Sequence, residues 1–159
     1  MTSPAETIAI ELAGLPATRD LAECLARIAK PGDVIALYGD LGVGKSEFAR
    51  FFIRHLTDPD EEVPSPTFTL LQTYESEACD ICHFDLYRLE RPEEAFELGI
   101  EDAFHECISI IEWPERLGPY MPRNRLDVHL IITKGKNHRQ ATLTPHADWS
   151  ERLRACGHG

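Results

Sequence analysis

The sequence predicts an α/β fold in which helices cover both faces of a mainly parallel central sheet. Short apolar runs that suit buried strands alternate along the chain with segments whose apolar residues recur every three or four positions, as on one face of a helix. This alternation is typical of parallel strands joined by helices, and in such folds the ligand lies at the carboxyl ends of the strands. A glycine-rich segment at residues 39–46 joins one predicted strand to one predicted helix and marks that end of the sheet.

The first third of the chain predicts two strands and two helices. Residues 8–12 alternate in character and predict a strand with one buried face. A helix follows, with Thr18 as its expected cap. The sequence Lys-Pro-Gly at residues 30–32 is expected to end this helix. Residues 33–38 form a short apolar run before a glycine and predict a buried strand. From Lys45 onward, apolar residues recur at helical spacing and predict the second helix.

The rest of the chain predicts five strands and two short helices. The expected strands are rich in β-branched and aromatic residues and are bounded by turns: residues 69–74, 81–87, 108–111, 126–132 and 140–143. The last two flank a polar turn and are expected to pair as a hairpin. Pro92–Leu98 predicts a short helix that Gly99 closes, and the tail from His146 predicts a terminal helix.

Length and composition favour one domain, residues 1–159, without a membrane segment. A chain of 159 residues is long enough for a single core. No apolar stretch reaches the roughly 20 residues of a membrane span, and the N-terminus lacks the basic start and apolar core of a signal peptide. We therefore expect a cytoplasmic protein. The formal net charge of -11 opposes direct binding to nucleic acid, whose phosphates would be repelled.

Residues 39–46 read Gly-Asp-Leu-Gly-Val-Gly-Lys-Ser and match the pattern GxxxxGK[ST] at every fixed position. Glycines let consecutive amide N–H groups turn toward the oxygens of a polyphosphate, and the N-terminus of the following helix adds unpaired N–H groups. Lys45 would reach the β- and γ-phosphates, and the Ser46 hydroxyl would take one Mg2+ position. The motif predicts a P-loop NTPase-type three-layer sandwich. The absence of an Asn-Lys-x-Asp sequence disfavours a GTPase.

Two acids follow the apolar runs of predicted strands and compete for the second position at Mg2+. Asp85 ends the run Ile-Cys-His-Phe, and Glu112 ends the run Ile-Ser-Ile-Ile. Either carboxylate would face the metal if its strand lies beside the glycine-rich segment. We favour Glu112, which closes the more apolar run, as the Mg2+ ligand. Asp85 then orients the attacking water or holds the outer shell of the metal.

The segment Cys79-Asp80-Ile81-Cys82-His83 has a second interpretation. It matches the C-x-x-C-H pattern of covalent haem attachment and contains three groups that bind zinc. Haem attachment belongs to exported proteins, and zinc would lack a fourth ligand at finger-like spacing. We therefore favour the interpretation in which Cys82 and His83 simply belong to a strand.

Four sequence blocks together resemble a known family. They are Gly-Asp-Leu-Gly-Val-Gly-Lys-Ser, then Ser65-Pro66-Thr67-Phe68, then His83-Phe84-Asp85-Leu86-Tyr87-Arg88, and then Ile111-Glu112-Trp113-Pro114-Glu115-Arg116. In this order and spacing, over residues 17–143, the chain resembles the bacterial TsaE family, formerly called YjeE. The last three blocks are not general P-loop features, so their joint presence is specific. The resemblance implies a small ATPase of threonylcarbamoyladenosine synthesis, a modification next to the anticodon of tRNAs.

The resemblance also assigns residues to the nucleotide, with ATP and Mg2+ as cofactors. The residues assigned to the phosphates are Asp40, Leu41, Gly42, Val43, Gly44, Lys45 and Ser46. Thr18 and Arg139 fall where the family contacts nucleotide outside the glycine-rich segment. One departure lies at Ser46-Glu47, where the family usually has two threonines. Serine still suits Mg2+, whereas the acid at position 47 is expected to weaken the attraction for ATP slightly.

Catalysis and partners are implied in the same way. The residues expected to act in catalysis are Lys45, Thr67, Asp85, Glu112 and Trp113. Ser46 and Glu112 would hold Mg2+, and Thr67 resembles a switch threonine that senses the γ-phosphate. The family works with the TsaD and TsaB proteins, so tRNA is expected to be reached only indirectly, through the complex. A small-molecule kinase and a nucleotide-dependent binding module remain the alternative functions.

Overall fold

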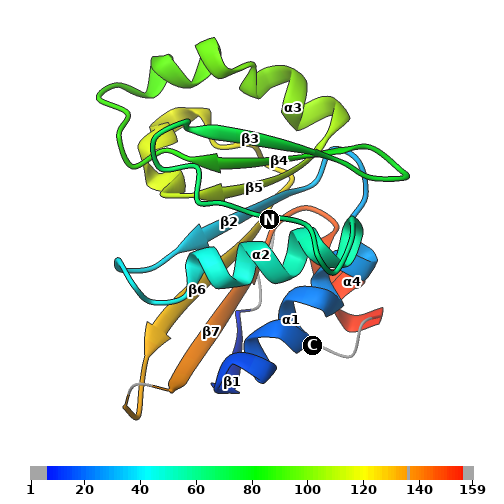
Figure 1. Ribbon diagram of the computed structural model, residues 1–159, viewed down its shortest axis with the longest axis vertical. Helices are drawn as coiled ribbons and strands as arrows, with labels where there is room; N and C mark the ends of the chain where they lie inside the picture. Colours follow the sequence, from blue (N-terminus) through cyan, green and yellow to red (C-terminus); the bar gives the residue numbers. More distant parts are fainter. Residues whose placement is uncertain (1–6, 136, 156–159) are drawn as a thin grey trace, which may run out of the picture.

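The computed structural model describes residues 7–135 and 137–155, which form seven strands, four α-helices and two 3-10 helices (Figure 1). In chain order the elements are β1 (Ile8–Ala13), α1 (Leu15–Ile28), β2 (Val34–Tyr38), α2 (Lys45–Leu56), β3 (Leu71–Glu75), β4 (Asp80–Asp85), η1 (Pro92–Leu98), α3 (Ile100–Glu106), β5 (Ile108–Glu112), η2 (Pro114–Tyr120), β6 (Leu126–Ile132), β7 (His138–Pro145) and α4 (Trp149–Ala155). None of the helices in the described ranges is long and apolar enough to cross a membrane.

All seven strands belong to one sheet in the order β1-β7-β6-β2-β5-β4-β3. The four central strands, β6, β2, β5 and β4, pair in parallel. The outer pairs, β1 with β7, β7 with β6, and β3 with β4, are antiparallel. The sheet is therefore mixed, and the prediction of a mainly parallel sheet is correct only for its centre. The reason is that β3–β4 and β6–β7 are joined by connections too short for a parallel crossover.

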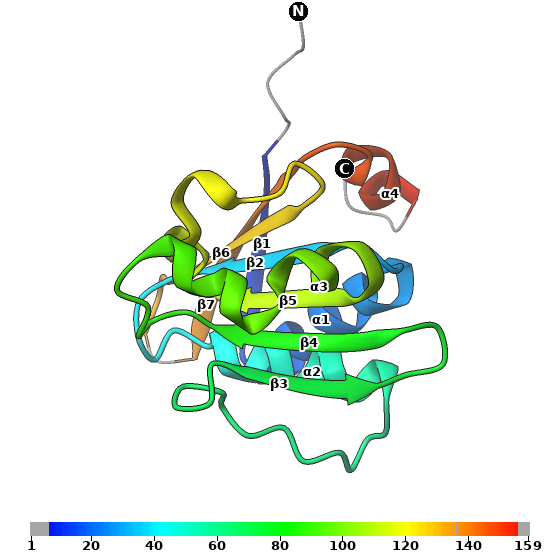
Figure 2. The ribbon, with the colours of Figure 1, turned by 90° about the horizontal axis from the view of Figure 1, so that it is seen from above.

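Helices cover both faces of the sheet and give three layers (Figures 1 and 2). One core cluster joins α1, α2 and α4 to strand residues such as Ile35 and Ile110. The other joins η1, α3 and η2 to Val34 and Ile111, the next residues along the same strands. Because successive side chains of a strand point to opposite faces, these adjacent residues enter different cores. The predicted α/β class and three layers are confirmed.

Several predicted boundaries were wrong in informative ways. Helix α1 begins at Leu15 after Gly14, so Thr18 lies inside the first turn and does not cap the helix. The short helix predicted at Pro92–Leu98 is confirmed with these bounds, as the 3-10 helix η1, but after Gly99 the chain enters a further helix, α3, which was not predicted. Strand β3 starts at Leu71, two residues later than expected. The predicted terminal helix and the hairpin of β6 and β7 are confirmed.

A buried ion pair fastens helix α4 to the start of β2. Asp33, just before β2, is fully buried, and its two carboxylate oxygens accept hydrogen bonds from Arg152 Nη1 at 3.0 Å and Nη2 at 2.6 Å. The Lys30 backbone N–H donates to the same carboxylate at 2.7 Å, and Arg152 also donates to the Ile28 carbonyl. Because β2 leads directly into the glycine-rich segment, this ion pair supports the strand that carries the site.

We expect Arg152→Ala to lower the free energy of unfolding by about 3 kcal/mol, because a buried carboxylate that loses its partner keeps its desolvation cost. Urea unfolding followed by circular dichroism measures the loss. Arg154→Ala, an exposed arginine on the same helix, is the matched control and should leave the unfolding midpoint nearly unchanged. Equal midpoints for the two variants would contradict the importance of this ion pair.

Candidate functional site

The glycine-rich segment forms the turn between β2 and α2, and glycine is favoured at different positions in it for different structural reasons. At Gly39, with φ of 146°, a Cβ would lie 2.7 Å from Val43 Cγ1 and 2.8 Å from the Leu130 carbonyl oxygen, so no side chain fits. Gly44 adopts a left-handed conformation, with φ of 118°, and precedes the first residue of α2. A Cβ at Gly42 or Gly44 would meet nothing within 4 Å. The segment thus exposes backbone to an open space at the helix N-terminus, as an anion site requires.

Lys45, the first residue of α2, is only 5% exposed although it carries a charge. Its Nζ donates a hydrogen bond to the Gly39 carbonyl oxygen at 2.6 Å and lies 3.5 Å from the centre of the Trp113 ring. Burial lowers the pKa of the Lys45 ammonium, and nearby carboxylates, chiefly Glu112, act in the opposite direction. The ammonium is therefore held inside the glycine-rich segment, where it meets any anion bound there.

Trp113 is placed by an unusual backbone conformation directly after β5. Its φ of 58° and ψ of 50° lie in the left-handed region, which costs a bulky residue about 1–3 kcal/mol. The Trp113 ring packs against Tyr87 with ring centres 4.9 Å apart, and Lys45 covers it. Strain of this kind concentrates at functional sites. The structure therefore brings the predicted Trp113 into contact with the predicted Lys45.

The two competing acids lie side by side at the carboxyl ends of parallel strands. Asp85 of β4 pairs in register with Glu112 of β5, which pairs in turn with Leu37 of β2. Glu112 shares a face of β5 with the core residue Ile110, and that face is covered by α2. The Ser46 hydroxyl at the start of α2 donates to Glu112 Oε1 at 3.2 Å. The two residues predicted to hold Mg2+ are thus in direct contact.

Asp85 has a different set of partners from Glu112. Its Oδ2 accepts a hydrogen bond from the Thr67 hydroxyl at 3.1 Å, and its Oδ1 accepts one from the Tyr87 backbone N–H at 3.0 Å. Thr67 lies in the loop before β3, and its hydroxyl is 2.8 Å from that of Ser65. The predicted switch threonine therefore contacts Asp85 and not Glu112, although the two acids are neighbours. This division supports separate roles for the two carboxylates.

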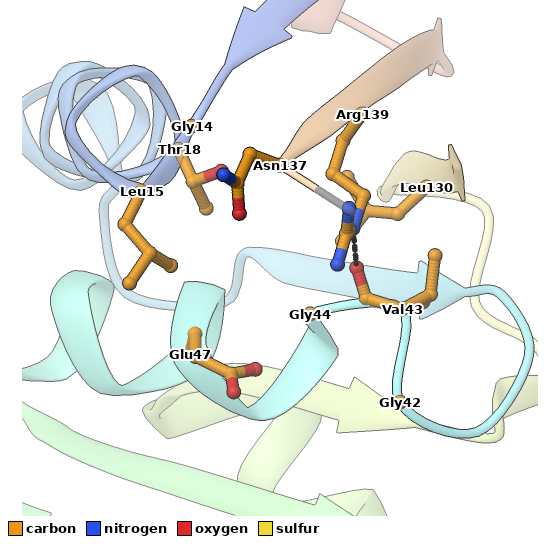
Figure 3. Close-up of a pocket in the computed structure, with 10 residues that line it drawn as sticks. All are labelled: Gly14, Leu15, Thr18, Gly42, Val43, Gly44, Glu47, Leu130, Asn137 and Arg139. Atoms are coloured by element: carbon orange, nitrogen blue, oxygen red, sulfur yellow. Dashed lines mark hydrogen bonds between the residues drawn. The ribbon is translucent and has the colours of Figure 1, made fainter. Parts of the chain in front are cut away.

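A cavity of about 240 Å3 lies beside the glycine-rich segment, between α1 and the β6–β7 hairpin (Figure 3). Thr18 lines it from α1, and Asn137 and Arg139 line it from the hairpin. Arg139 Nε donates to the Val43 carbonyl oxygen at 2.7 Å, which ties the hairpin to the glycine-rich segment. Thr18 and Arg139, the two residues that the family resemblance placed outside the glycine-rich segment, thus line the same cavity.

Comparison with known proteins identifies the family. Residues 12–141 match the family model of the threonylcarbamoyl adenosine biosynthesis protein TsaE. The chain belongs to the TsaE family. This confirms the resemblance that the four sequence blocks indicated.

Similar proteins of known name agree with this assignment. The chain is 43% identical over 115 residues to the tRNA threonylcarbamoyladenosine biosynthesis protein TsaE of Rickettsia felis, which covers 72% of this chain and 67% of that protein. It is 36% identical over 128 residues to TsaE of Bacillus subtilis, covering 80% and 78% of the two chains. The crystal structure of Bacillus subtilis YdiB superposes with a TM-score of 0.79 at 26% identity, covering 97% of this chain and 95% of the other. This TsaE family member is therefore similar to its relatives in sequence and in fold over most of its length.

Several residues of the candidate site were not predicted from the sequence of this TsaE family member. His83 was noted in the Cys79–His83 pattern and as the first residue of a family block, but no role at the site was assigned to it. The Cys79–His83 segment does contribute Cys82 and His83 to β4, as favoured. Yet His83 Nε2 lies 2.7 Å from Glu112 Oε2. The period of two along a strand is the signal that was available, because it places His83 on the same face as Asp85. Asn137 and Leu15 line the cavity, and no local pattern in the sequence distinguishes them.

Proposed function

We propose that this protein binds ATP with Mg2+ and hydrolyses it in the cytoplasm as a component of tRNA threonylcarbamoyladenosine synthesis, together with the TsaD and TsaB proteins. Family membership supports the pathway. The observation that carries the ATPase assignment is the contact between Ser46 and Glu112, at 3.2 Å, beside the open glycine-rich segment. It joins an oxygen-rich cation site to an anion site, which is the combination that a Mg2+–nucleotide needs.

The residues at the candidate site fit both Mg2+ and the phosphates of ATP. Mg2+ prefers oxygen ligands and usually keeps only one or two from the protein, with phosphate and water oxygens completing the shell. Ser46 Oγ and Glu112 Oε1 would provide the protein ligands. When bound, Mg2+ neutralises charge that develops on the phosphates. The backbone of residues 40–46 would hold the phosphate oxygens, and the Lys45 ammonium would lie against them.

Asp85 and Thr67 would act on the attacking water. Asp85 is buried beside Glu112, and its Oδ2 accepts from Thr67 at 3.1 Å, so its carboxylate is oriented before a substrate arrives. An oriented carboxylate at this place would accept a hydrogen bond from the water and aim it at the γ-phosphate. Thr67 would sense the γ-phosphate through the loop that carries it. Trp113 would keep Lys45 in place through the stacking of the ammonium on its ring.

The cavity beside the glycine-rich segment would hold the adenosine half of ATP. It lies on the side of residues 42–44 that faces α1 and the β6–β7 hairpin, and it is lined by both apolar and hydrogen-bonding groups. Thr18 and Asn137 would provide the polar contacts, and Leu15 an apolar wall. Glu47 also lines this cavity, so the acid that departs from the family pattern would lie near the nucleotide and lower the attraction for its charge.

Phosphate release from ATP, measured with and without purified TsaD and TsaB, tests this proposal. We expect slow release by the protein alone and faster release with the two partners, while tRNA modification scored in parallel depends on ATP. A single small chain has few groups to stabilise the transition state, which is why we expect the partners to accelerate the reaction.

Three outcomes would reject the proposal. Rapid phosphorylation of a small metabolite without any effect of the partners would indicate a kinase. Tight binding of ATP with no hydrolysis under any condition would indicate a nucleotide-dependent binding module. Unchanged tRNA modification after the protein is omitted would exclude the assigned pathway.

A further inference from the structure

His83 is a polar side chain buried in the sheet beneath the candidate Mg2+ site. Only 1% of it is exposed, and it lies on β4, beside Ile110 of the neighbouring parallel strand β5. The alternation along the two strands directs His83, Asp85 and Glu112 to the same face, which α2 covers. The imidazole therefore lies on the interior side of the two carboxylates, away from any bound substrate.

Among the described residues, the hydrogen-bond partner of this ring is the carboxylate of Glu112. The Nε2 atom lies 2.7 Å from Glu112 Oε2. A carboxylate oxygen can only accept a hydrogen bond, so Nε2 carries the hydrogen and is the donor of this bond. The other ring nitrogen, Nδ1, is buried without a hydrogen-bond partner in the described part of the chain. Burial of a half-satisfied imidazole is unfavourable, so packing alone gives no reason for a histidine here.

The contact matters because the two oxygens of Glu112 have different partners. Oε1 accepts from the Ser46 hydroxyl at 3.2 Å, and Oε2 accepts from His83 at 2.7 Å. The terminal torsion of a glutamate side chain has a broad energy profile, and a carboxylate held at one oxygen can rotate. A second hydrogen bond from a rigid, buried ring removes that freedom. Glu112 is consequently held with Oε1 toward Ser46.

We propose that His83 is a positioning residue that fixes the Glu112 carboxylate so that Oε1, beside Ser46, is available to Mg2+. This inference rests on the proposed function, and it adds a residue that acts through Glu112 without touching the metal or the nucleotide. Groups that orient a metal ligand from behind typically change metal affinity or activity by 10- to 100-fold when they are replaced.

The test compares three variants of the full-length protein. His83→Phe keeps an aromatic ring but removes the donor, His83→Gln keeps an N–H donor near the position of Nε2, and Phe84→Leu changes the next buried residue of β4 on the opposite face. Binding of a non-hydrolysable ATP analogue is measured by calorimetry across a series of Mg2+ concentrations and again with the metal chelated. Thermal unfolding shows that each variant is folded.

The Mg2+ midpoint is the Mg2+ concentration at which the metal has half of its full effect on the affinity for the analogue. We expect His83→Phe to raise this midpoint by about 10-fold or more, with little change in the affinity for the analogue when the metal is chelated. His83→Gln should recover most of this loss, and Phe84→Leu should leave the Mg2+ midpoint at the wild-type value. A purely structural role predicts instead that His83→Phe and Phe84→Leu lower stability without moving the Mg2+ midpoint.

Two results would overturn the inference while the proposed function stands. They are a folded His83→Phe protein with the wild-type Mg2+ midpoint, and a shift that Phe84→Leu reproduces. If His83→Phe and His83→Gln both fail to fold, histidine is required for the fold and the positioning role is rejected. Wild-type protein whose binding of the analogue does not depend on Mg2+ would reject the proposed metal site, and this inference with it.

Discussion

Lys45→Ala is expected to weaken ATP binding by roughly 100-fold. The Lys45 ammonium is held inside the glycine-rich segment, 2.6 Å from the Gly39 carbonyl oxygen, so in the proposed complex it lies against the phosphates. Hydrogen bonds to charged groups contribute about 1.5–3 kcal/mol each, and the loss of about 3 kcal/mol weakens binding roughly 100-fold. Calorimetric titration with Mg2+–ATP measures the change. The backbone of residues 40–46 remains in this variant, but its N–H groups alone do not balance the phosphate charge.

The control for this prediction is Lys30→Ala. Lys30 is an exposed lysine whose Nζ pairs with Asp148 at 3.2 Å, on the surface near α4, and its removal lowers the net charge by the same amount. We expect this variant to bind ATP like the wild type. If the two lysine variants lost affinity equally, the effect would come from overall charge, and the assignment of Lys45 to the phosphates would be wrong.

Glu112→Ala is expected to remove Mg2+-dependent hydrolysis while sparing much of the affinity for the nucleotide. The Ser46 hydroxyl donates to this carboxylate at 3.2 Å, and within residues 7–135 and 137–155 it makes no hydrogen bond to another acid. Replacing a group that only orients a metal ligand typically costs 10- to 100-fold in metal affinity or activity, so we expect loss of the ligand itself to lower turnover by about 100-fold or more. Phosphate release at saturating ATP over a range of Mg2+ concentrations measures the loss.

Glu106→Gln provides the matched control, because Glu106 is an exposed acid at the end of α3, two residues before β5 begins at Ile108. Its turnover should equal that of the wild type. Tight binding of Mg2+–ATP with undiminished turnover in Glu112→Ala would refute the metal assignment and would make Asp85, the neighbouring acid, the better candidate ligand.

The order of strand, glycine-rich segment and helix around Lys45 was predictable because it depends on local signals. A short apolar run and a helical period are properties of adjacent residues, and the glycines are needed for backbone angles within the turn itself. The positions of Asp85 and Glu112 at strand ends followed from the same reasoning. The structure adds that their strands are direct neighbours, paired in register.

Other features could not be derived from local patterns. Helix α3 was missed because Gly99 is a valid helix end, and only packing of Ile100 and Ala103 in the second core shows that a new helix begins there. The start of α1 was misplaced because Thr18 is a good cap by composition, whereas the structure uses Gly14. Thr18 instead lines the cavity, a role set by the distant hairpin that closes over it.

The sequence by itself determined the α/β class, the glycine-rich segment between a strand and a helix and, through four spaced blocks, the family. These depend on residue order and spacing, which the chain carries directly. Only the tertiary structure decided that antiparallel strands flank the parallel centre, that Ser46 contacts Glu112 while Thr67 contacts Asp85, and that His83 lies behind Glu112. Contacts between residues far apart in the chain depend on strand order and register, and those are set by the packing of the whole core.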